Sequence, residues 1–307
     1  MHIYAAAIAS VFFAAQIIIP EAAVKRSATL AETGHCKEAL PQLKNAQGHI
    51  ANDEMKRRVG VAGVRCSMTV KDAVGAASFL SWLLHEFPRD PAVLYLASHV
   101  YSDLSIQSSN ELLATAPGSP QVHELNAEAL ETMGKWKEAA DEYRAVLSKE
   151  PGMAGIHYRL GRLMLSMPNA QPTVKEDARK EFEDELKVDP ANAGANFVLG
   201  ELARQAERWP EAIAYFSKAS TLDTSFVDAF IGLGRAYLAA GKPAEATAPL
   251  ETAAKLQPDS PLVHFELATA YRRAGRKDDA AREFQAHKLA SEKASQTQDE
   301  IKNRISR

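Results

Sequence analysis

The sequence predicts an all-α protein in which about eight helical pairs stack into a right-handed superhelical solenoid. The first observation is an alanine that returns every 34 residues, at Ala178, Ala212, Ala246 and Ala280. The second is Ala139, which joins this series if five extra residues are allowed before Ala178. A constant period of this length indicates repeated helical units, each of which buries its apolar face against its neighbours.

Further residue types recur at fixed distances from the alanine. The clearest unit contains Phe230, Leu233, Gly234, Tyr237, Gly241, Ala246, Leu250, Ala253 and Pro258. The units of Ala139, Ala178, Ala212 and Ala280 repeat parts of this pattern. It resembles the tetratricopeptide repeat, W-x2-L-G-x2-Y…A-x3-F…P. The resemblance implies helical pairs whose first helices line a concave, protein-binding groove.

The repeated positions have physical roles. Leu233, Gly234 and Tyr237 would share one face of the first helix, where the glycine lets a second helix approach closely. A glycine five residues before the alanine suits a left-handed cap at the end of the first helix. A proline twelve residues after the alanine would end the second helix. We place the five extra residues, within 166–172, in a longer loop between two helices of one unit.

The first part of the chain follows the same period less regularly. Lys37-Glu38-Ala39-Leu40 returns 34 residues later as Lys71-Asp72-Ala73-Val74, and Gly34 lies five residues before Ala39. A third pair is expected between Pro91 and Pro117. We therefore expect degenerate repeats over 24–118, regular repeats over 119–289, and a polar capping helix or tail over 290–307.

Residues 1–23 are predicted to be an export signal or an N-terminal membrane anchor. Ile3 to Pro20 form an apolar stretch interrupted only by Ser10 and Gln16. Its length suits the apolar region of a signal peptide, but the basic segment that normally precedes one is missing. An uncleaved anchor and a buried first helix remain alternatives, because the stretch lies near the short end of what spans a bilayer.

The two cysteines are expected to lie close together. Cys36 would begin the second helix of the first pair, and Cys66 would lie near the end of the following helix. Consecutive helices run antiparallel, so these two ends meet. In an exported protein such a pair favours a disulfide. Two separate buried thiols are the alternative, since free cysteines are often buried.

Composition and motifs argue against several function classes. The net charge is −3, without a local basic cluster, which disfavours a nucleic-acid partner. His123, His157 and His264 occupy the slot of the repeat's packing aromatic, too far apart to share a metal. No catalytic or phosphate-binding motif is present. We therefore expect no enzyme activity, no metal and no cofactor.

The residues left free by the repeat template form the candidate groove. An apolar row on the first helices is flanked by charged residues, mostly arginines, which would suit a peptide carrying hydrophobic side chains and carboxylates. In the alternative interpretation, the rings pack between helices and the arginines pair with neighbouring acids. The candidate residues are Tyr158, Arg162, Phe197, Glu201, Arg204, Ile231, Arg235, Phe265 and Arg272.

Together these features predict an exported, periplasmic or cell-envelope scaffold or adaptor that binds a protein or peptide and is itself a monomer. The alternative is a structural or assembly component of the envelope, attached to the membrane by an uncleaved N-terminus.

Overall fold

The computed structural model describes residues 20–168 and 173–305, which contain fifteen helices and no strand. The predicted signal or anchor, up to residue 19, lies outside the described residues. Within the described ranges, no helix is both long and apolar enough to cross a bilayer. The chain forms two compact units, residues 1–115 and 116–307, and each is described by itself.

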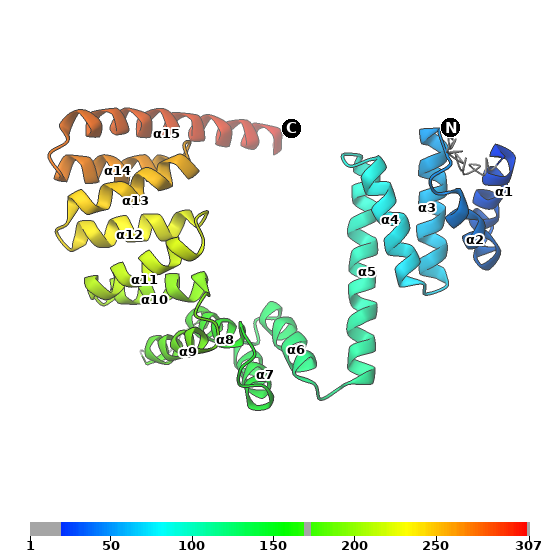
Figure 1. Cartoon of the computed structure of the whole chain (residues 1–307), viewed down its shortest axis with the longest axis horizontal. Helices are drawn as coiled ribbons and strands as arrows, with labels where there is room; N and C mark the ends of the chain where they lie inside the picture. Colours follow the sequence, from blue (N-terminus) through cyan, green and yellow to red (C-terminus); the bar gives the residue numbers. More distant parts are fainter. Residues whose placement is uncertain (1–19, 169–172, 306–307) are drawn as a thin grey trace, which may run out of the picture. The chain divides into compact units, whose positions relative to one another are not determined.

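The N-terminal unit contains two helical pairs followed by a single long helix (Figure 1). The pair expected between Pro91 and Pro117 is wrong, because these residues form one helix of 25 residues. No glycine or proline interrupts this stretch between Ala92 and Thr115, so nothing in its backbone requires a turn. The helices are α1 (Glu21–Glu32), α2 (Cys36–Ala46), α3 (Asp53–Thr69), α4 (Ala73–Glu86) and α5 (Pro91–Thr115).

The repeat alanine of the second pair is Ala76, three residues beyond the expected Ala73. Ala76 is fully buried, whereas Ala73 is exposed and Val74 is 82% exposed. Five residues before Ala76, Lys71 adopts the positive φ that Gly34 adopts before Ala39. The first helix of this pair, α3, has 17 residues against 12 in α1. The longer helix shifts the register that a strict 34-residue spacing had predicted.

The C-terminal unit contains five helical pairs stacked in chain order, with each helix packed against the next (Figure 1). The described residues thus contain seven pairs and one unpaired helix, where about eight pairs were expected. The helices are α6 (Pro120–Thr132), α7 (Trp136–Lys149), α8 (Ile156–Ser166), α9 (Val174–Val188), α10 (Ala193–Gln205), α11 (Trp209–Leu222), α12 (Val227–Ala239), α13 (Pro243–Leu256), α14 (Pro261–Arg273) and α15 (Lys277–Ile305).

Glycines on the first helices make room for phenylalanines on the second helices. A Cβ atom on Gly161 would lie 2.9 Å from the Phe182 ring, and one on Gly200 would lie 2.8 Å from the Phe216 ring. Gly232, on the first helix of the following pair, approaches the other side of Phe216. Phe216 therefore fills the space within its own pair and also joins that pair to the next.

The predicted caps are present at the ends of the first helices. Gly134, Gly241 and Gly275 have φ values of 71°, 73° and 82°, in the left-handed region where glycine carries no steric penalty. In the unit of Ala212 the same position is Glu207, with φ 58°. The prolines expected to end the second helices follow α7, α9 and α13 by two residues.

A buried carboxylate, which the sequence analysis did not single out, caps α8. Gly155 precedes this helix with φ 87° and has no side chain with which to cap it. Instead, the side chain of Glu185 on α9 accepts hydrogen bonds from the backbone N–H groups of Gly155, at 2.8 Å, and Tyr158, at 3.2 Å. The Asn192 amide donates a third bond at 3.1 Å. A negative charge at this end of α8 also opposes the positive end of the helix dipole.

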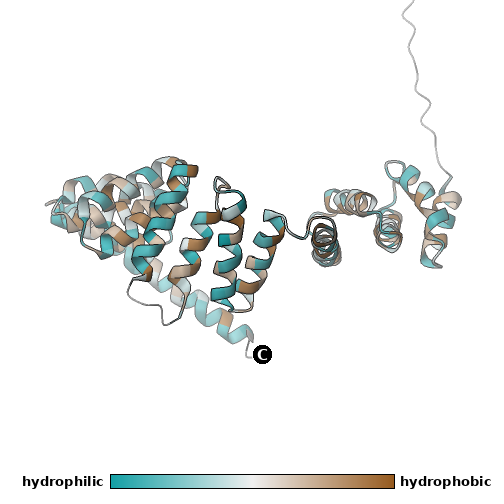
Figure 2. Ribbon diagram, turned by 90° about the horizontal axis from the view of Figure 1, so that it is seen from below, coloured by the Kyte–Doolittle hydropathy of each residue, from teal (hydrophilic) through white to brown (hydrophobic). Residues whose placement is uncertain are grey.

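The end of the chain continues the last helix of the stack. Residues 290–305 belong to α15, whose inner face is packed through Phe284 and Ala290. Beyond Ser291, the described side chains are exposed. Figure 2 shows these final turns as mainly hydrophilic. Among the described residues no further pair covers these turns, and their exposed polar side chains suit a solvent-facing surface.

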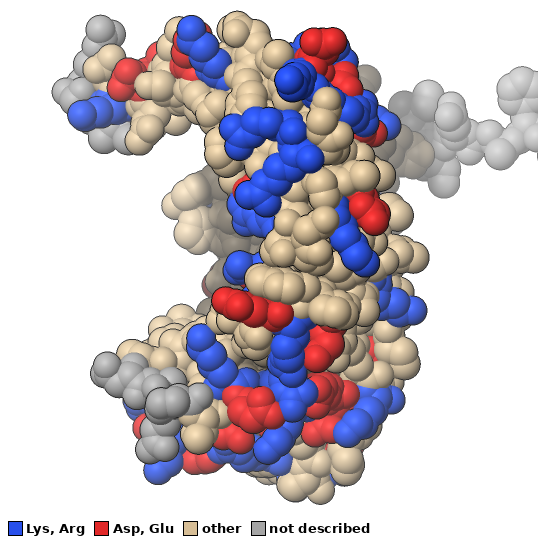
Figure 3. All heavy atoms as spheres, turned by 90° about the vertical axis from the view of Figure 1, so that its left-hand side faces the viewer, with Lys and Arg blue, Asp and Glu red and all other residues tan. Residues whose placement is uncertain are grey.

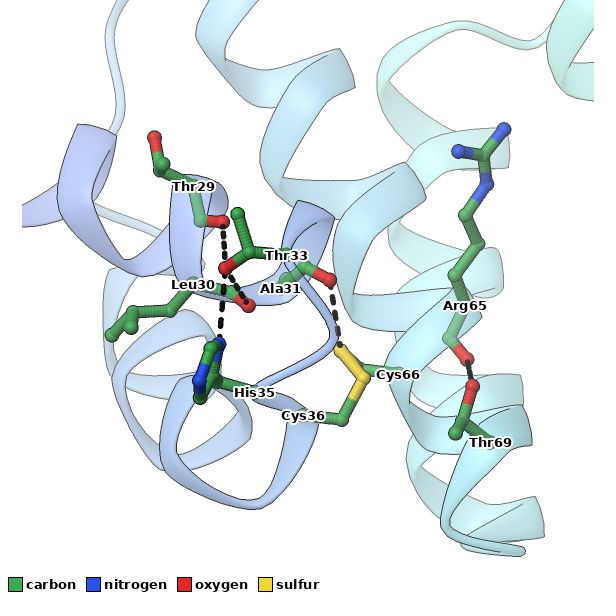
Figure 4. Close-up of a disulfide and its surroundings, with 9 residues drawn as sticks. All are labelled: Thr29, Leu30, Ala31, Thr33, His35, Cys36, Arg65, Cys66 and Thr69. Atoms are coloured by element: carbon green, nitrogen blue, oxygen red, sulfur yellow. Dashed lines mark hydrogen bonds between the residues drawn. A yellow bond between two sulfur atoms is a disulfide. The ribbon is translucent and has the colours of Figure 1, made fainter.

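The disulfide between Cys36 and Cys66 links the first two pairs (Figure 4). Cys36 is the first residue of α2, and Cys66 lies one turn before the end of α3. Their Cα atoms are 4.9 Å apart, and both side chains belong to the core cluster of this unit. The bond closes a loop with a sequence separation of 30 residues. Such a loop restricts the unfolded chain considerably.

Removing the last turns of α15 should leave stability almost unchanged. A chain that ends at Ser295 loses only exposed described side chains. We expect its melting temperature, measured by circular dichroism, to fall by less than about 2 °C. A control chain that ends at Glu283 also loses Phe284 and Ala290 and should melt several degrees lower. A large drop on the shorter deletion would show that residues 296–307 stabilise the core.

Replacing Glu185 by alanine should destabilise the C-terminal unit by about 2–4 kcal/mol, because two partly buried N–H groups lose their acceptor. Urea unfolding followed by circular dichroism measures the change. Glu183→Ala is the matched control on the same helix, where Arg179 retains its ion pair with Glu176. Equal effects of the two substitutions would show that the cap at Glu185 does not stabilise α8.

Replacing both cysteines by serine should lower the unfolding free energy of the N-terminal unit by about 3 kcal/mol, mainly by releasing the unfolded chain. The measurement is urea unfolding of the oxidised protein and of the double variant. Mass spectrometry after alkylation without reductant tests the bond itself. Two freely alkylated thiols, in protein purified from an oxidising compartment, would contradict it.

Candidate partner-binding groove

The predicted aromatic row packs chiefly between the two helices of each pair. Tyr158 contacts Phe182 with ring centroids 5.7 Å apart, and Phe197 contacts Phe216 at the same distance. Phe265 contacts Phe284 at 6.3 Å. In each case, a ring on the first helix meets the phenylalanine four residues after the repeat alanine. These rings therefore hold the pairs together, as the alternative interpretation expected.

Ile231, by contrast, does not belong to the groove surface. It is only 5% exposed and packs in a small cluster with Ala253 and Val263. Two glycines, Gly232 and Gly234, follow it closely, and the neighbouring helices approach α12 at these positions. Ala253 on α13 and Val263 on α14 cover Ile231. Phe265 is the member of the row that remains well exposed, at 46% of its surface.

Two of the predicted arginines already have acidic partners. Arg204 donates to Glu201 one turn earlier on α10, with a closest distance of 2.8 Å. Arg235 on α12 pairs with Glu266 on α14, also at 2.8 Å. Glu201 and Glu266 therefore compete with any carboxylate that a partner would bring to these arginines. Glu201 itself serves as an internal counter-ion.

Arg162 and Arg272 are exposed and remain available. Within the part of the chain that the structure describes, neither side chain forms an ion pair. The Arg162 guanidinium lies 5.9 Å from the centre of the Tyr158 ring, and that of Arg272 lies 5.6 Å from the Phe284 ring. The rings orient each guanidinium while leaving its hydrogen-bond donors free. These two arginines are the best placed of the predicted set to bind a carboxylate.

Basic side chains form a broken column across one face of the C-terminal unit, and acidic side chains crowd towards its lower end (Figure 3). Residues without a charged side chain lie between the basic groups. Some of the charged residues predicted from the sequence are engaged internally, Arg204 with Glu201 and Arg235 with Glu266.

A cleft of about 480 Å³ lies between α6 and α8, with α7 behind it. Arg162 is the predicted site residue that lines it. The others are Glu128, Glu131, Thr132, Trp136, Tyr143, Arg159 and Ser166. Arg159 pairs with Glu128, and lies 3.4 Å from Glu124. The cleft is therefore polar, with one exposed arginine at its edge.

Tyr143 forms the back of this cleft as a hydrogen-bond donor. Its hydroxyl lies 2.7 Å from Glu131 and donates to it. Burial, and then the Glu131 carboxylate, raise the pKa of Tyr143. The phenol therefore stays protonated over the physiological range, and the contact joins the two helices of the pair. Glu131 is thus used in a contact within the pair.

The three histidines in the aromatic slot form a repeated contact that the sequence analysis missed. Nδ1 of His123 lies 2.6 Å from Glu142, that of His157 lies 2.7 Å from Glu181, and that of His264 lies 2.6 Å from Glu283. Each glutamate lies three residues after the repeat alanine. The sequence therefore already indicated this contact, because the glutamates recur at a fixed distance from the repeat alanine. No group of three or more possible metal ligands occurs among the described residues.

For His264 the surroundings favour the charged form. Burial lowers its pKa, but hydrogen bonds to the Pro258 carbonyl and to Glu283 outweigh burial, and the pKa is raised overall. The imidazole thus acts as a polar link between α14 and α15 in addition to filling the aromatic slot.

The model of the tetratricopeptide repeat matches residues 125–166, 175–224 and 231–295, about half of the chain. The protein belongs to the tetratricopeptide repeat family. The matched residues lie in the C-terminal unit, where the alanine period is most regular. As a tetratricopeptide repeat protein, it has the fold of a protein-interaction scaffold.

Solved structures share this tetratricopeptide fold. A MamA crystal structure is 22% identical with a TM-score of 0.50, and covers 55% of this chain and 96% of its own. MamA from Desulfovibrio magneticus RS-1 is 16% identical with a TM-score of 0.50, covering 57% and 96%. YrrB, described as a protein of this type with an unusual peptide-binding site, is 15% identical with a TM-score of 0.51, covering 59% and 91%. No curated protein matches the chain.

Proposed function

We propose that this tetratricopeptide repeat protein is a non-enzymatic adaptor that binds a partner peptide or protein on the first helices of its C-terminal unit. The observation that carries the proposal is the pair of exposed arginines, Arg162 and Arg272, each placed beside an aromatic ring and without an internal carboxylate. Phe265 supplies exposed apolar surface near Phe284, the ring beside Arg272. The peptide-binding site of YrrB, on the same fold, supports a peptide as the class of partner.

The partner suited to this surface carries carboxylates and apolar side chains. A desolvated arginine–carboxylate contact contributes about 1.5–3 kcal/mol, and an exposed one at most about 1 kcal/mol. The groove helices are already ordered by their internal rings and ion pairs. Binding would therefore require little further ordering of the scaffold, which favours affinity.

The proposed place of action is an exported, periplasmic or cell-envelope compartment. The apolar sequence between Ile3 and Pro20 and the Cys36–Cys66 disulfide both support it. Disulfides persist in oxidising compartments and are rare where thiols are kept reduced. Cell fractionation tests the location: an exported adaptor should appear in the soluble periplasmic fraction as a monomer.

The same N-terminal sequence supports a second candidate, a structural or assembly component anchored to the membrane. If this second candidate is correct, the protein stays in the membrane pellet after a high-salt wash and keeps its N-terminal residues. Mass spectrometry of the intact mature chain distinguishes the two, because cleavage near residue 23 would remove the anchor.

Reversing the charge of the free arginines should weaken partner binding. We expect the double variant Arg162→Glu, Arg272→Glu to lose about tenfold or more in affinity, with helicity and melting unchanged. Arg204→Glu, Arg235→Glu should have a smaller effect, because those arginines are already paired. The assay is a quantitative pull-down with mass spectrometry, followed by titration of the captured partner.

The matched control is Lys218→Glu, Lys255→Glu. It makes the same change of charge at exposed positions of the second helices α11 and α13. This control should bind like the wild type. If the Arg162 and Arg272 variant keeps full affinity, or if the control loses as much, then the first helices of the C-terminal unit do not form the binding surface.

A further inference from the structure

A second cleft lies in the N-terminal unit, between α3 and α5, outside the residues matched by the family model. Its volume is about 480 Å³. It arises because α5 packs mainly against α4, whereas α1 packs directly against α3. The lining residues are Arg57, Val61 and Arg65 on α3, with Ala92, Val93, Tyr95, Leu96 and His99 on α5.

The wall formed by α3 has an apolar residue between two arginines. Arg57, Val61 and Arg65 are spaced by four residues, so they follow one another along a single face of the helix. Eight residues of α-helix place the backbone positions of the two arginines about 12 Å apart. Val61 is partly buried on the core of this unit and forms apolar floor between them.

The two arginines have different surroundings. Arg57 is held by an ion pair with Asp90 and by the Phe87 ring, whose centre lies 4.0 Å from the guanidinium. Asp90 engages only one of its terminal nitrogens, so other donors remain, although Asp90 competes with a ligand carboxylate for Arg57. Arg65 forms no ion pair among the described residues, although its charge contributes to lowering the pKa of Glu32. Figure 4 shows its guanidinium directed away from the disulfide.

The opposite wall is apolar and aromatic. Tyr95 is 68% exposed, and its ring lies 4.4 Å from that of His99, measured between centroids. Val93 and Leu96 continue the apolar floor. Of the residues that line this cleft, none is acidic. An apolar cleft with cationic groups at both ends of one wall is complementary to a ligand that is apolar in the middle and anionic on both sides.

We propose that this cleft binds an extended peptide segment in which an apolar side chain lies between two acidic residues. An extended chain advances about 3.3 Å per residue, so carboxylates three to four residues apart would match the 12 Å spacing of Arg57 and Arg65. The apolar side chain would lie on Val61 and Leu96, against Tyr95. A fatty acid or a lipid would offer one anionic end and leave the second arginine without a partner.

This site is independent of the proposed groove in the C-terminal unit, so a partner could contact either unit alone. The test is a selection of displayed random dodecapeptides on the full chain, followed by fluorescence anisotropy with synthetic copies of the enriched sequences. We expect the enriched peptides to share two acidic residues, three or four positions apart, with an apolar residue between them.

Three variants then locate the site. Arg65→Glu should weaken binding of the enriched peptides at least about tenfold, and Tyr95→Ala about fivefold. Both side chains are exposed, so folding should be unaffected, which melting curves verify. Arg26→Glu makes the same charge change at an exposed position of α1 outside this cleft and should bind like the wild type. Replacing the two acidic residues of the peptide by amides should reproduce the loss.

Three outcomes would overturn the proposal. The selection could enrich no peptide, or peptides without the acidic pair. The enriched peptides could lose affinity with Arg162→Glu, Arg272→Glu but not with Arg65→Glu, which would place them on the C-terminal unit. Vesicles of phosphatidylcholine and phosphatidylglycerol could bind in an Arg65-dependent way while the peptides do not, which would make the cleft a lipid site.

Discussion

The regular part of this protein depends on one contact, in which the large side chain four residues after the repeat alanine lies against a glycine of the first helix in three of the units. Phe182 meets Gly161, and Phe216 meets both Gly200 and, across the seam to the next pair, Gly232. A methyl group at these glycines would overlap the ring, so the residue type sets how closely the helices approach. The same ring couples neighbouring pairs, which is why the unit extends as a stack.

This packing has a direct consequence for recognition. The aromatic residues on the inner side of the first helices, such as Tyr158 and Phe197, are used to cover the phenylalanines of the second helices. Their neighbouring charges are partly used as well, since Arg204 and Arg235 have internal partners. A tightly packed solenoid therefore offers a partner fewer residues than its inner sequence rows indicate.

The α3–α5 and α6–α8 clefts lie between helices that are not packed directly against each other. The α1–α3, α10–α12 and α12–α14 neighbours are in close contact, whereas clefts lie between α3 and α5 and between α6 and α8. The two clefts differ in chemistry: the second is polar with internal ion pairs, while the first is apolar and rimmed by arginines. The disulfide lies in the unit with the less regular repeat, where it adds a covalent link between the first two pairs.

The sequence by itself determined the helical-pair fold, the left-handed glycine caps and the prolines after second helices, because these depend on local conformation and on a period that five units share. It did not determine the single helix α5 or the shifted register at Ala76, because helix length changes the spacing without changing the residue types. The burial of Ile231, the Glu185 cap of α8 and the separation of free from paired arginines were decided by the tertiary structure. Each depends on how closely neighbouring helices approach, which depends on residues from different helices acting together.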